Sequence, residues 1–473
     1  MLTRITRLFA PAVLLLNPLA AQSQSDPSFK LSTTNAAAAA HFRAGVSDFQ
    51  NVSFESAASH MKMAIDADPG FGLARVLYAS VAVLTPAQQR TELDRGVADA
   101  MRANANEGAL AAAYRAAALN QADSAPALFH NASSMMPNDV LLEWQAAGGF
   151  GQAVASSRSF AEKHPKYPLA YNTVAYQEWV AGNHAAALAA AKRQVELLPN
   201  APNPHDTYAE LLQWNGDFAG AAAQYRDAAK TPPKFPEAYA GLAEVAALQG
   251  NYSEARKDLR DAIDHAWNPA QKLNYMRQIV GTHILDGSTA AMTMEAINAA
   301  ITEAKAQNNS AATATLLTQL ATVQAAGGDA DAAHASLASA TQISGPRPWG
   351  ARYFGTMTHA LLRHWAPVDQ ELAAIKAMPA TDANAMPAPW LAALQGAVLT
   401  FQGKPDDALT ILNAADTSNV LVANRIAEAH AALGHNAEAA AWNQRVATNY
   451  RLNLADFTDV NSRRRAKQEL AAR

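Results

Sequence analysis

The sequence contains no cysteine, which excludes disulfide bridges, thiolate nucleophiles and cysteine metal ligands. Aromatic residues make up only 7% and charged residues only 16% of the chain, although half of it is hydrophobic. Alanine supplies much of that half, which favours helices that pack closely through small side chains over strands rich in Val, Ile and Thr. The formal net charge of -4 provides no general attraction to nucleic acid or to anionic lipid.

The first residues have the pattern of a secretory signal peptide. Arg4 and Arg7 precede a short apolar run over residues 8–16, and small residues follow, so we expect a signal over residues 1–21. A membrane anchor is the alternative, but the run is far shorter than the roughly 20 residues that span a bilayer. We therefore predict an exported protein, periplasmic or secreted, with a flexible segment over residues 22–36 and no later membrane span.

Four glycines are spaced 34 residues apart in the middle of the chain: Gly148, Gly182, Gly216 and Gly250. Small residues recur five positions after each glycine and seven positions before the last three. The positions after the glycines are Ala153, Ala187, Ala221 and Ala255, and those before them are Ala175, Ala209 and Ala243. Pro165, Pro199 and Pro233 follow the first three glycines by 17 residues.

These columns predict two helices in each 34-residue unit. Glycine ends the first helix because it takes the left-handed conformation at little cost, and proline ends the second. The two alanine columns allow the helices of a pair to approach closely. The pattern resembles the tetratricopeptide repeat, which implies an all-α, right-handed α-solenoid of stacked helix-turn-helix units, some of them degenerate.

The register extends in both directions and divides the chain. We expect an N-terminal array over residues 37–268, a degenerate helical repeat over 269–312, one repeat-like unit over 313–345, an irregular proline-containing helical segment over 346–387, a C-terminal pair over 388–450, and a polar capping helix over 451–473. The two irregular stretches, residues 269–309 and 345–388, are either degenerate units or a hinge.

No motif supports a catalytic or metal site. The S-x-x-K spelling at Ser59 lacks its partner motifs, and the pairs His359 and His364, and His430 and His435, are five residues apart instead of the four that a helical metal pair requires. A basic cluster at residues 463–467 reads as a solvated helix face, with an electrostatic contact as the alternative. We therefore expect no cofactor and no metal.

The resemblance also implies a groove lined by the first helices of the units, which receives extended or helical peptides. Mapped through the matching columns, the groove residues are Asn172, Tyr176, Trp179, Asn203, Asp206, Glu210, Gln213, Glu237 and Glu244. Chaperone-binding members clamp a terminal carboxylate with basic residues that this groove lacks. Acids beside aromatic rings suit a peptide with an apolar anchor and basic or amide neighbours. The alternative is that these are ordinary exposed residues of a solenoid.

The sequence thus predicts a non-catalytic scaffold of the bacterial cell envelope that captures a protein or peptide partner on its concave face. One alternative is an accessory or regulatory subunit of an envelope enzyme or assembly machine, or an enzyme whose site lies in the irregular stretches. Another is a self-associating structural solenoid.

Overall fold

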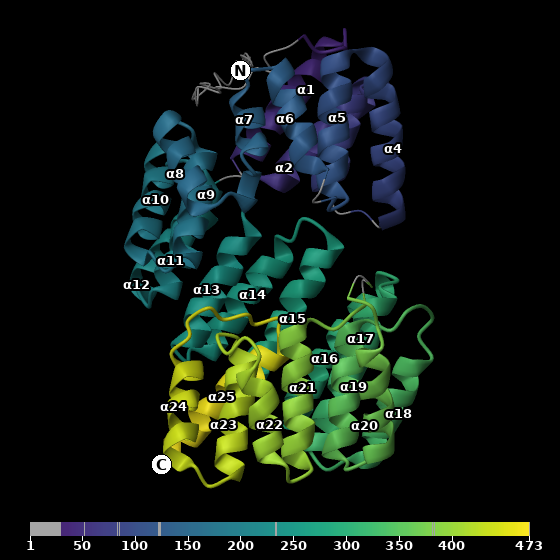
Figure 1. Cartoon of the computed structure of the whole chain (residues 1–473), viewed down its shortest axis with the longest axis vertical. Coiled ribbons are helices and arrows are strands. Elements are labelled where there is room, and N and C mark those ends of the chain that lie inside the picture. Colours follow the sequence, from purple (N-terminus) through teal and green to yellow (C-terminus); the bar gives the residue numbers. More distant parts are fainter. Residues whose placement is uncertain are drawn as a thin grey trace, which may run out of the picture. The chain divides into compact units, whose positions relative to one another are not determined.

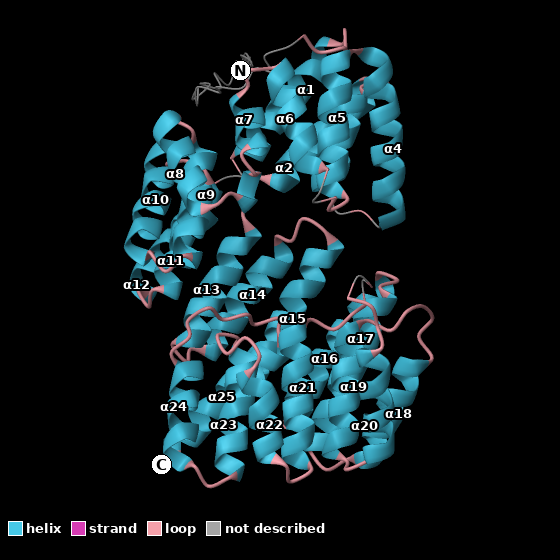
Figure 2. Ribbon diagram, in the orientation of Figure 1, coloured by secondary structure: helices cyan, strands magenta, loops and turns pink. Residues whose placement is uncertain are grey.

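The computed structural model describes residues 30–51, 53–82, 84, 86–121, 124–231, 234–380, 382 and 384–472. The predicted signal peptide and residues 22–29 lie outside this part, as does Pro233. The regular structure of the described residues is helical, α1 to α25 with one short 3-10 turn, and contains no strand (Figure 2). None of these helices combines the length and apolarity needed to cross a membrane.

The chain forms two compact units, residues 1–173 and 174–473, with the boundary inside α9 (Pro168–Val180). Unit 1 contains four helix pairs before α9, and its helices are α1 (Ala36–Gln50), α2 (Phe54–Ala67), α3 (Gly72–Val81), α4 (Pro86–Ala103), α5 (Ala105–Ala118), α6 (Ala125–Met135), α7 (Val140–Ala146) and α8 (Val154–Lys163). Phe42, Phe71 and Trp144 are among its largest fully buried side chains. The Trp144 indole donates a hydrogen bond to the Thr173 hydroxyl at 3.1 Å.

The segment before α1 is held by hydrogen bonds of unit 1. Ser32 donates to Glu107 from its backbone and from its hydroxyl, and the Thr33 hydroxyl donates to Asp68 at 2.6 Å. Asn35 caps α1 by accepting from two backbone amides. The prediction of a flexible segment is therefore wrong for residues 32–35.

Unit 2 continues the same arrangement of helical hairpins (Figure 1). Its further helices are α10 (His184–Leu197), α11 (Pro202–Trp214), α12 (Phe218–Lys230), α13 (Pro236–Leu248), α14 (Tyr252–Asp264), α15 (Pro269–Leu285), α16 (Ala290–Ala306), α17 (Ser310–Ala326), α18 (Ala330–Thr341), α19 (Trp349–Leu361), α20 (Trp365–Lys376), α21 (Ala388–Phe401), α22 (Pro405–Asn413), α23 (Val420–Ala432), α24 (Asn436–Ala447) and α25 (Phe457–Ala471). Each irregular stretch of sequence thus contains a helical hairpin, α15 with α16 and α19 with α20.

The predicted repeat columns have their expected geometry in the central units. Gly182, Gly216 and Gly250 have φ of 82°, 86° and 83°, in the left-handed region that ends the first helix. The alanine columns of these units are fully buried where the paired helices meet: Ala175, Ala187, Ala209, Ala221, Ala243 and Ala255. The resulting architecture is an all-α solenoid of tetratricopeptide-like hairpins.

The unit at Gly148 departs from the predicted register. Residues Gly149–Gly151 form a 3-10 turn, so α8 begins six residues after Gly148, whereas α10 begins two residues after Gly182. The fourth residue of the second helix faces the first helix in both units. In α8 this residue is Ser157, which is buried, and Ala153 is exposed instead of being a packing contact.

The C-terminal region also differs from the prediction. The expected capping helix over residues 451–473 begins only at Phe457, where the Asp456 side chain caps α25 by accepting from two backbone amides. Residues 448–456, which we call the connector, contain no helix. Because α25 packs against α15, α23 and α24, it lies on the first helices of unit 2 and is largely buried (Figure 1).

Candidate functional site

The predicted groove residues lie on three first helices, α9, α11 and α13, but they differ in accessibility. Tyr176, Asp206, Glu210 and Glu244 are partly exposed. Asn172, Trp179 and Gln213 are 3%, 8% and 0% exposed, so these three are not open surface positions. Glu237 is also partly exposed, and Asn203 is 9% exposed. A role of these nine residues in peptide binding stays a prediction.

Four of the carboxyl groups on α11 and α13 form what we call the acidic cluster: Asp206, Glu210, Glu237 and Glu244. Three of them accept hydrogen bonds from neutral side chains. The Tyr176 hydroxyl donates to Glu210 at 2.6 Å, the Gln213 amide donates to Glu244 at 3.1 Å, and the Gln271 amide donates to Glu237 at 2.6 Å. Among the described residues, no three His, Asp or Glu side chains are arranged to hold a metal ion.

Burial raises the pKa values of three carboxyl groups of the acidic cluster. Burial raises the pKa of Glu244 to about 8, although the hydrogen bond from Gln213 lowers it. The pKa of Asp206 lies well above its ordinary value because of burial and then because of the other three carboxyl groups. Burial also raises the pKa of Glu210, and the Arg451 guanidinium opposes that rise. The cluster therefore favours a positively charged neighbour.

Aromatic side chains of α9 and α11 lie next to the acidic cluster. The Trp179 ring stacks on His184 with centroids 4.1 Å apart and lies 5.5 Å from Trp214, which also lies 6.2 Å from Tyr176. Trp214 is only partly buried, so one part of this aromatic group remains accessible beside the acids.

The connector lies across this surface and presents an apolar aromatic residue beside a basic one, the two residue types that the groove was expected to bind. The Tyr450 ring meets Phe218 edge-to-face at 5.1 Å, and the Arg451 guanidinium lies 4.4 Å from the centre of the Trp214 ring. The Gln213 amide donates to the Tyr450 carbonyl at 3.4 Å. An aromatic residue followed by a basic one thus occupies the aromatic and acidic surface.

The connector then passes over α15. A Cβ atom built on Gly281 would lie 2.0 Å from the Leu454 carbonyl oxygen, so only glycine permits this approach. Leu452 and Leu454 are buried in the hydrophobic core of unit 2, and the Arg277 guanidinium donates to the Ala455 carbonyl at 3.2 Å. We call the surface of α11, α13 and α15 that faces the connector and α25 the inner surface.

Arg463 holds the connector from the other side. Its guanidinium donates to the backbone carbonyls of Asn449 and Arg451 and forms an ion pair with Asp459 at 2.8 Å. The side chain is 3% exposed. The prediction of a solvated helix face is therefore wrong for Arg463, whose buried guanidinium binds two backbone carbonyls of the connector, a segment without helical hydrogen bonds of its own.

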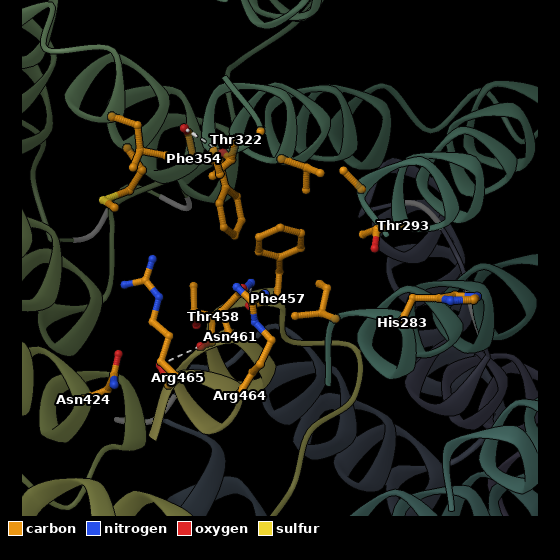
Figure 3. A pocket seen from close by; sticks show the side chains of 18 of the residues that line it. His283, Thr293, Thr322, Phe354, Asn424, Phe457, Thr458, Asn461, Arg464 and Arg465 are labelled. Carbon is orange, nitrogen blue, oxygen red and sulfur yellow. Dashed lines mark hydrogen bonds between the residues drawn. The ribbon is translucent and has the colours of Figure 1, made fainter. Parts of the chain in front are cut away.

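The next two arginines line a pocket of about 300 Å³ in unit 2 (Figure 3). Its walls come from α15, α16, α17, α19, α23 and α25, and so include both irregular stretches of sequence. The edge-to-face rings of Phe354 and Phe457, with centroids 5.2 Å apart, and Met357 provide apolar surface that we call the apolar floor. Figure 3 shows Arg464 and Arg465 rising from α25 beside it.

His283 and Ser288, which line the pocket, and the nearby Asp286 have the residue types of a hydrolytic triad but not its geometry. The Ser288 hydroxyl donates to Asp286 and lies 3.1 Å from His283 Nδ1, so serine stands between the acid and the histidine. Asp286 also pairs with Arg256 at 2.6 Å, and its pKa is lowered by these bonds against the effect of burial. The serine proton is directed to the weakly basic Asp286 carboxylate, whereas in a catalytic triad it is directed to the histidine. The three residues therefore form a hydrogen-bonded helix end.

In each of the two histidine pairs noted in the sequence, the two rings lie close to each other. His359 and His364 have ring centroids 6.2 Å apart, and His364 stacks on His334 at 5.1 Å. His430 and His435 lie with their Nδ1 atoms 3.4 Å apart.

Sequence reasoning missed Tyr450, Arg451 and the arginines of α25. The connector follows no repeat column, and it reaches residues of α11 that lie 237 positions earlier in the chain. The only available signal was the basic cluster at residues 463–465, for which an electrostatic contact was the second interpretation.

No protein-family model matches the chain, and none of the curated proteins matches it. Among solved structures, PilF of Pseudomonas aeruginosa is 14% identical, with 44% of this chain and 90% of that chain covered and a TM-score of 0.33. A tetratricopeptide repeat protein from Parabacteroides merdae is 13% identical, with 68% of this chain and 98% of that chain covered and a TM-score of 0.32. Scores this low carry no conclusion about function, so the description of the chain as tetratricopeptide-like rests on its own repeat and helical hairpins.

Proposed function

We propose that the protein is a non-catalytic, exported scaffold of the cell envelope that captures a protein partner on the inner surface of unit 2. The recognised element is an extended segment in which an aromatic residue stands next to a basic one. The observation that carries this proposal is the connector itself, because Tyr450 and Arg451 occupy the aromatic and acidic surface in that form.

The chemistry of the surface favours such a segment over an acidic one. Glu210, Glu244 and Glu237 accept hydrogen bonds from Tyr176, Gln213 and Gln271, which are neutral. Arg451 is a cation that lowers the pKa of Glu210. A guanidinium over an indole ring gains further from the negative face of the ring. A partner segment with this pattern would replace the connector or bind along its exposed edge.

Export is part of the proposal and is supported by the sequence of residues 1–21. An enzyme with its site in the irregular stretches is the competing function, since those stretches line the pocket. The position of Ser288 between Asp286 and His283 disfavours a serine hydrolase there.

Photo-crosslinking in the living cell tests the proposal. A photoreactive phenylalanine analogue replaces Trp214, which lies under Arg451, or Trp442 of α24, which lies under Arg445 at 4.9 Å and serves as the matched control. We expect a defined partner to crosslink at position 214 and not at 442, with the crosslinked peptide containing an aromatic–basic pair. Crosslinks that are the same at both positions, or an activity in hydrolase and transferase panels, would refute the proposal.

A further inference from the structure

The pocket beside α25 is strongly unbalanced in charge. Its lining includes Arg425, Arg464 and Arg465 and no aspartate or glutamate. One carboxylate, Glu428, lies behind the lining and pairs with both Arg425 and Arg465. The pocket therefore has a formal excess of two positive charges, because His283 is kept neutral by burial and by Arg256, which lower its pKa.

Arg464 carries one of these charges without a carboxylate partner among the described residues. Its only hydrogen bond there is a long one, 3.5 Å from a guanidinium nitrogen to the Asn461 side chain. Its Nε atom is buried and has no hydrogen-bond partner in that part of the chain. A buried donor without an acceptor is rare in native proteins and calls for a ligand or solvent that completes it.

Apolar surface lies within reach of the same arginine. The apolar floor faces the pocket, and Ile284, Val323 and Leu361 extend it on the side of α15 to α19. Figure 3 shows the two phenylalanine rings next to the end of the Arg464 side chain. The volume of about 300 Å³ lies at the lower end of the range of small-molecule pockets, roughly 300–1,000 Å³.

We propose that this pocket binds a small amphipathic organic anion, such as a fatty or aromatic carboxylate, with its acidic head on Arg464 and Arg465 and its chain or ring on the apolar floor. A planar guanidinium offers paired donors that match the two oxygens of such a head group. The bound anion would supply the acceptor that Arg464 lacks. Capture of a protein segment by the inner surface does not depend on this site.

A pair of fluorescent probes separates the anionic head from the apolar body. The probes are 8-anilinonaphthalene-1-sulfonate and its uncharged analogue N-phenyl-1-naphthylamine, titrated into the full-length protein. We expect the sulfonate to bind saturably with one molecule per chain, and at least about tenfold more tightly than the neutral probe, because the neutral probe has no anionic oxygens to accept charge-assisted hydrogen bonds from the arginines. Decanoate should displace it and decanol should not.

Single-residue variants locate the site. Arg464→Gln should weaken binding of the sulfonate at least about tenfold and leave the neutral probe unchanged, whereas Arg464→Lys, which retains the charge but not the paired donors, should weaken it less than Arg464→Gln does. Arg445→Gln, an equal change of charge at an exposed residue of α24 outside the lining, is the control and should bind like the parent. Melting temperatures confirm that each variant is folded.

Three results would overturn the proposal. They are the absence of saturable binding of the sulfonate, equal affinity in the parent and in folded Arg464→Gln, and equal affinity of the charged and neutral probes.

Discussion

Gly281 provides a direct test of where the connector lies. Replacing it with alanine adds a Cβ atom 2.0 Å from the Leu454 carbonyl oxygen and 3.0 Å from its carbon, and both are backbone atoms that cannot rotate away. Contacts under 3.0 Å essentially do not occur, so the connector or α15 must shift by about 1 Å. Overpacking of this kind costs about 1–3 kcal/mol, and the better helix propensity of alanine returns about 1 kcal/mol. We expect Gly281→Ala to lower the free energy of unfolding by up to about 2 kcal/mol.

Gly355 supplies the matched control. It lies inside α19, and the nearest atoms to an added Cβ are side-chain atoms of Arg347 and Leu337 at 3.7 and 3.9 Å, which is ordinary contact. Gly355→Ala should therefore be neutral or slightly stabilising.

The assay is urea unfolding combined with hydrogen–deuterium exchange of peptides that cover residues 448–456. The Asn453 amide donates to Asp459 at 2.8 Å and reports opening of the connector. In Gly281→Ala, exchange in this segment should accelerate about tenfold for each 1.4 kcal/mol lost locally, while the α17–α18 hairpin exchanges as in the parent. Unchanged stability and unchanged exchange in Gly281→Ala would refute the placement of the connector on α15.

Three further predictions concern the turns, the acidic cluster and the connector. Gly216→Val places a β-branched residue at φ 86° and should lower the free energy of unfolding by about 1–3 kcal/mol. It should also loosen the contact with Tyr450, whose ring lies 3.1 Å from the new Cβ atom, whereas Gly250→Val, with nothing within 4 Å, should disturb only its own turn. Equal hydrogen exchange of the connector in both variants would count against the Tyr450 contact. Because the folded state raises the pKa of Glu244 from 4.5 to about 8, it retains a proton that the unfolded state releases, so stability falls as pH rises from about 4.5 to 8. A rise of this size corresponds to at most about 5 kcal/mol, and because the Glu244 side chain is partly exposed we expect about 1–3 kcal/mol. Glu244→Gln should reduce the difference in the free energy of unfolding between pH 5 and pH 9 by that amount, and an unaltered difference would contradict the raised pKa of Glu244. Arg463→Met leaves Asp459 buried without its cation and should cost about 3–5 kcal/mol in the same assay, whereas a loss under 1 kcal/mol would contradict the role of Arg463 as the connector's anchor.

The regular part of the fold follows from local chemistry and was predictable. A glycine every 34 residues, an alanine on each side of the turn and a proline at the end of the second helix are short-range signals that each unit repeats. The Gly148 unit shows the limit of such columns, because the extra turn over Gly149–Gly151 moves the buried position from Ala153 to Ser157.

The site depends on contacts that have no periodic signature. Trp179 and Gln213 occupy groove columns yet are buried, the first by stacking on His184 and the second among Glu244, Tyr225 and Tyr450. Arg463 and Arg464 are adjacent in the sequence but face the connector and the pocket respectively. Which side of α25 is buried depends on its contact with α15, about 180 residues earlier, and no local pattern encodes that contact.

The central claim is that the inner surface of unit 2 binds an extended segment with an aromatic–basic pair, and binding of such a segment in trans tests it most directly. A fluorescent peptide with the sequence of residues 448–456, TNYRLNLAD, is titrated by anisotropy into the parent protein, into Arg451→Glu, and into Arg445→Glu, which makes an equal change of charge at an exposed residue of α24. We predict that the peptide binds Arg451→Glu at least about tenfold more tightly than the other two, because the connector of this variant competes less well and the surface beneath it is unchanged. A peptide with Arg451→Glu should not bind. Equal affinity for all three proteins, or equal binding of the two peptides, would contradict the account.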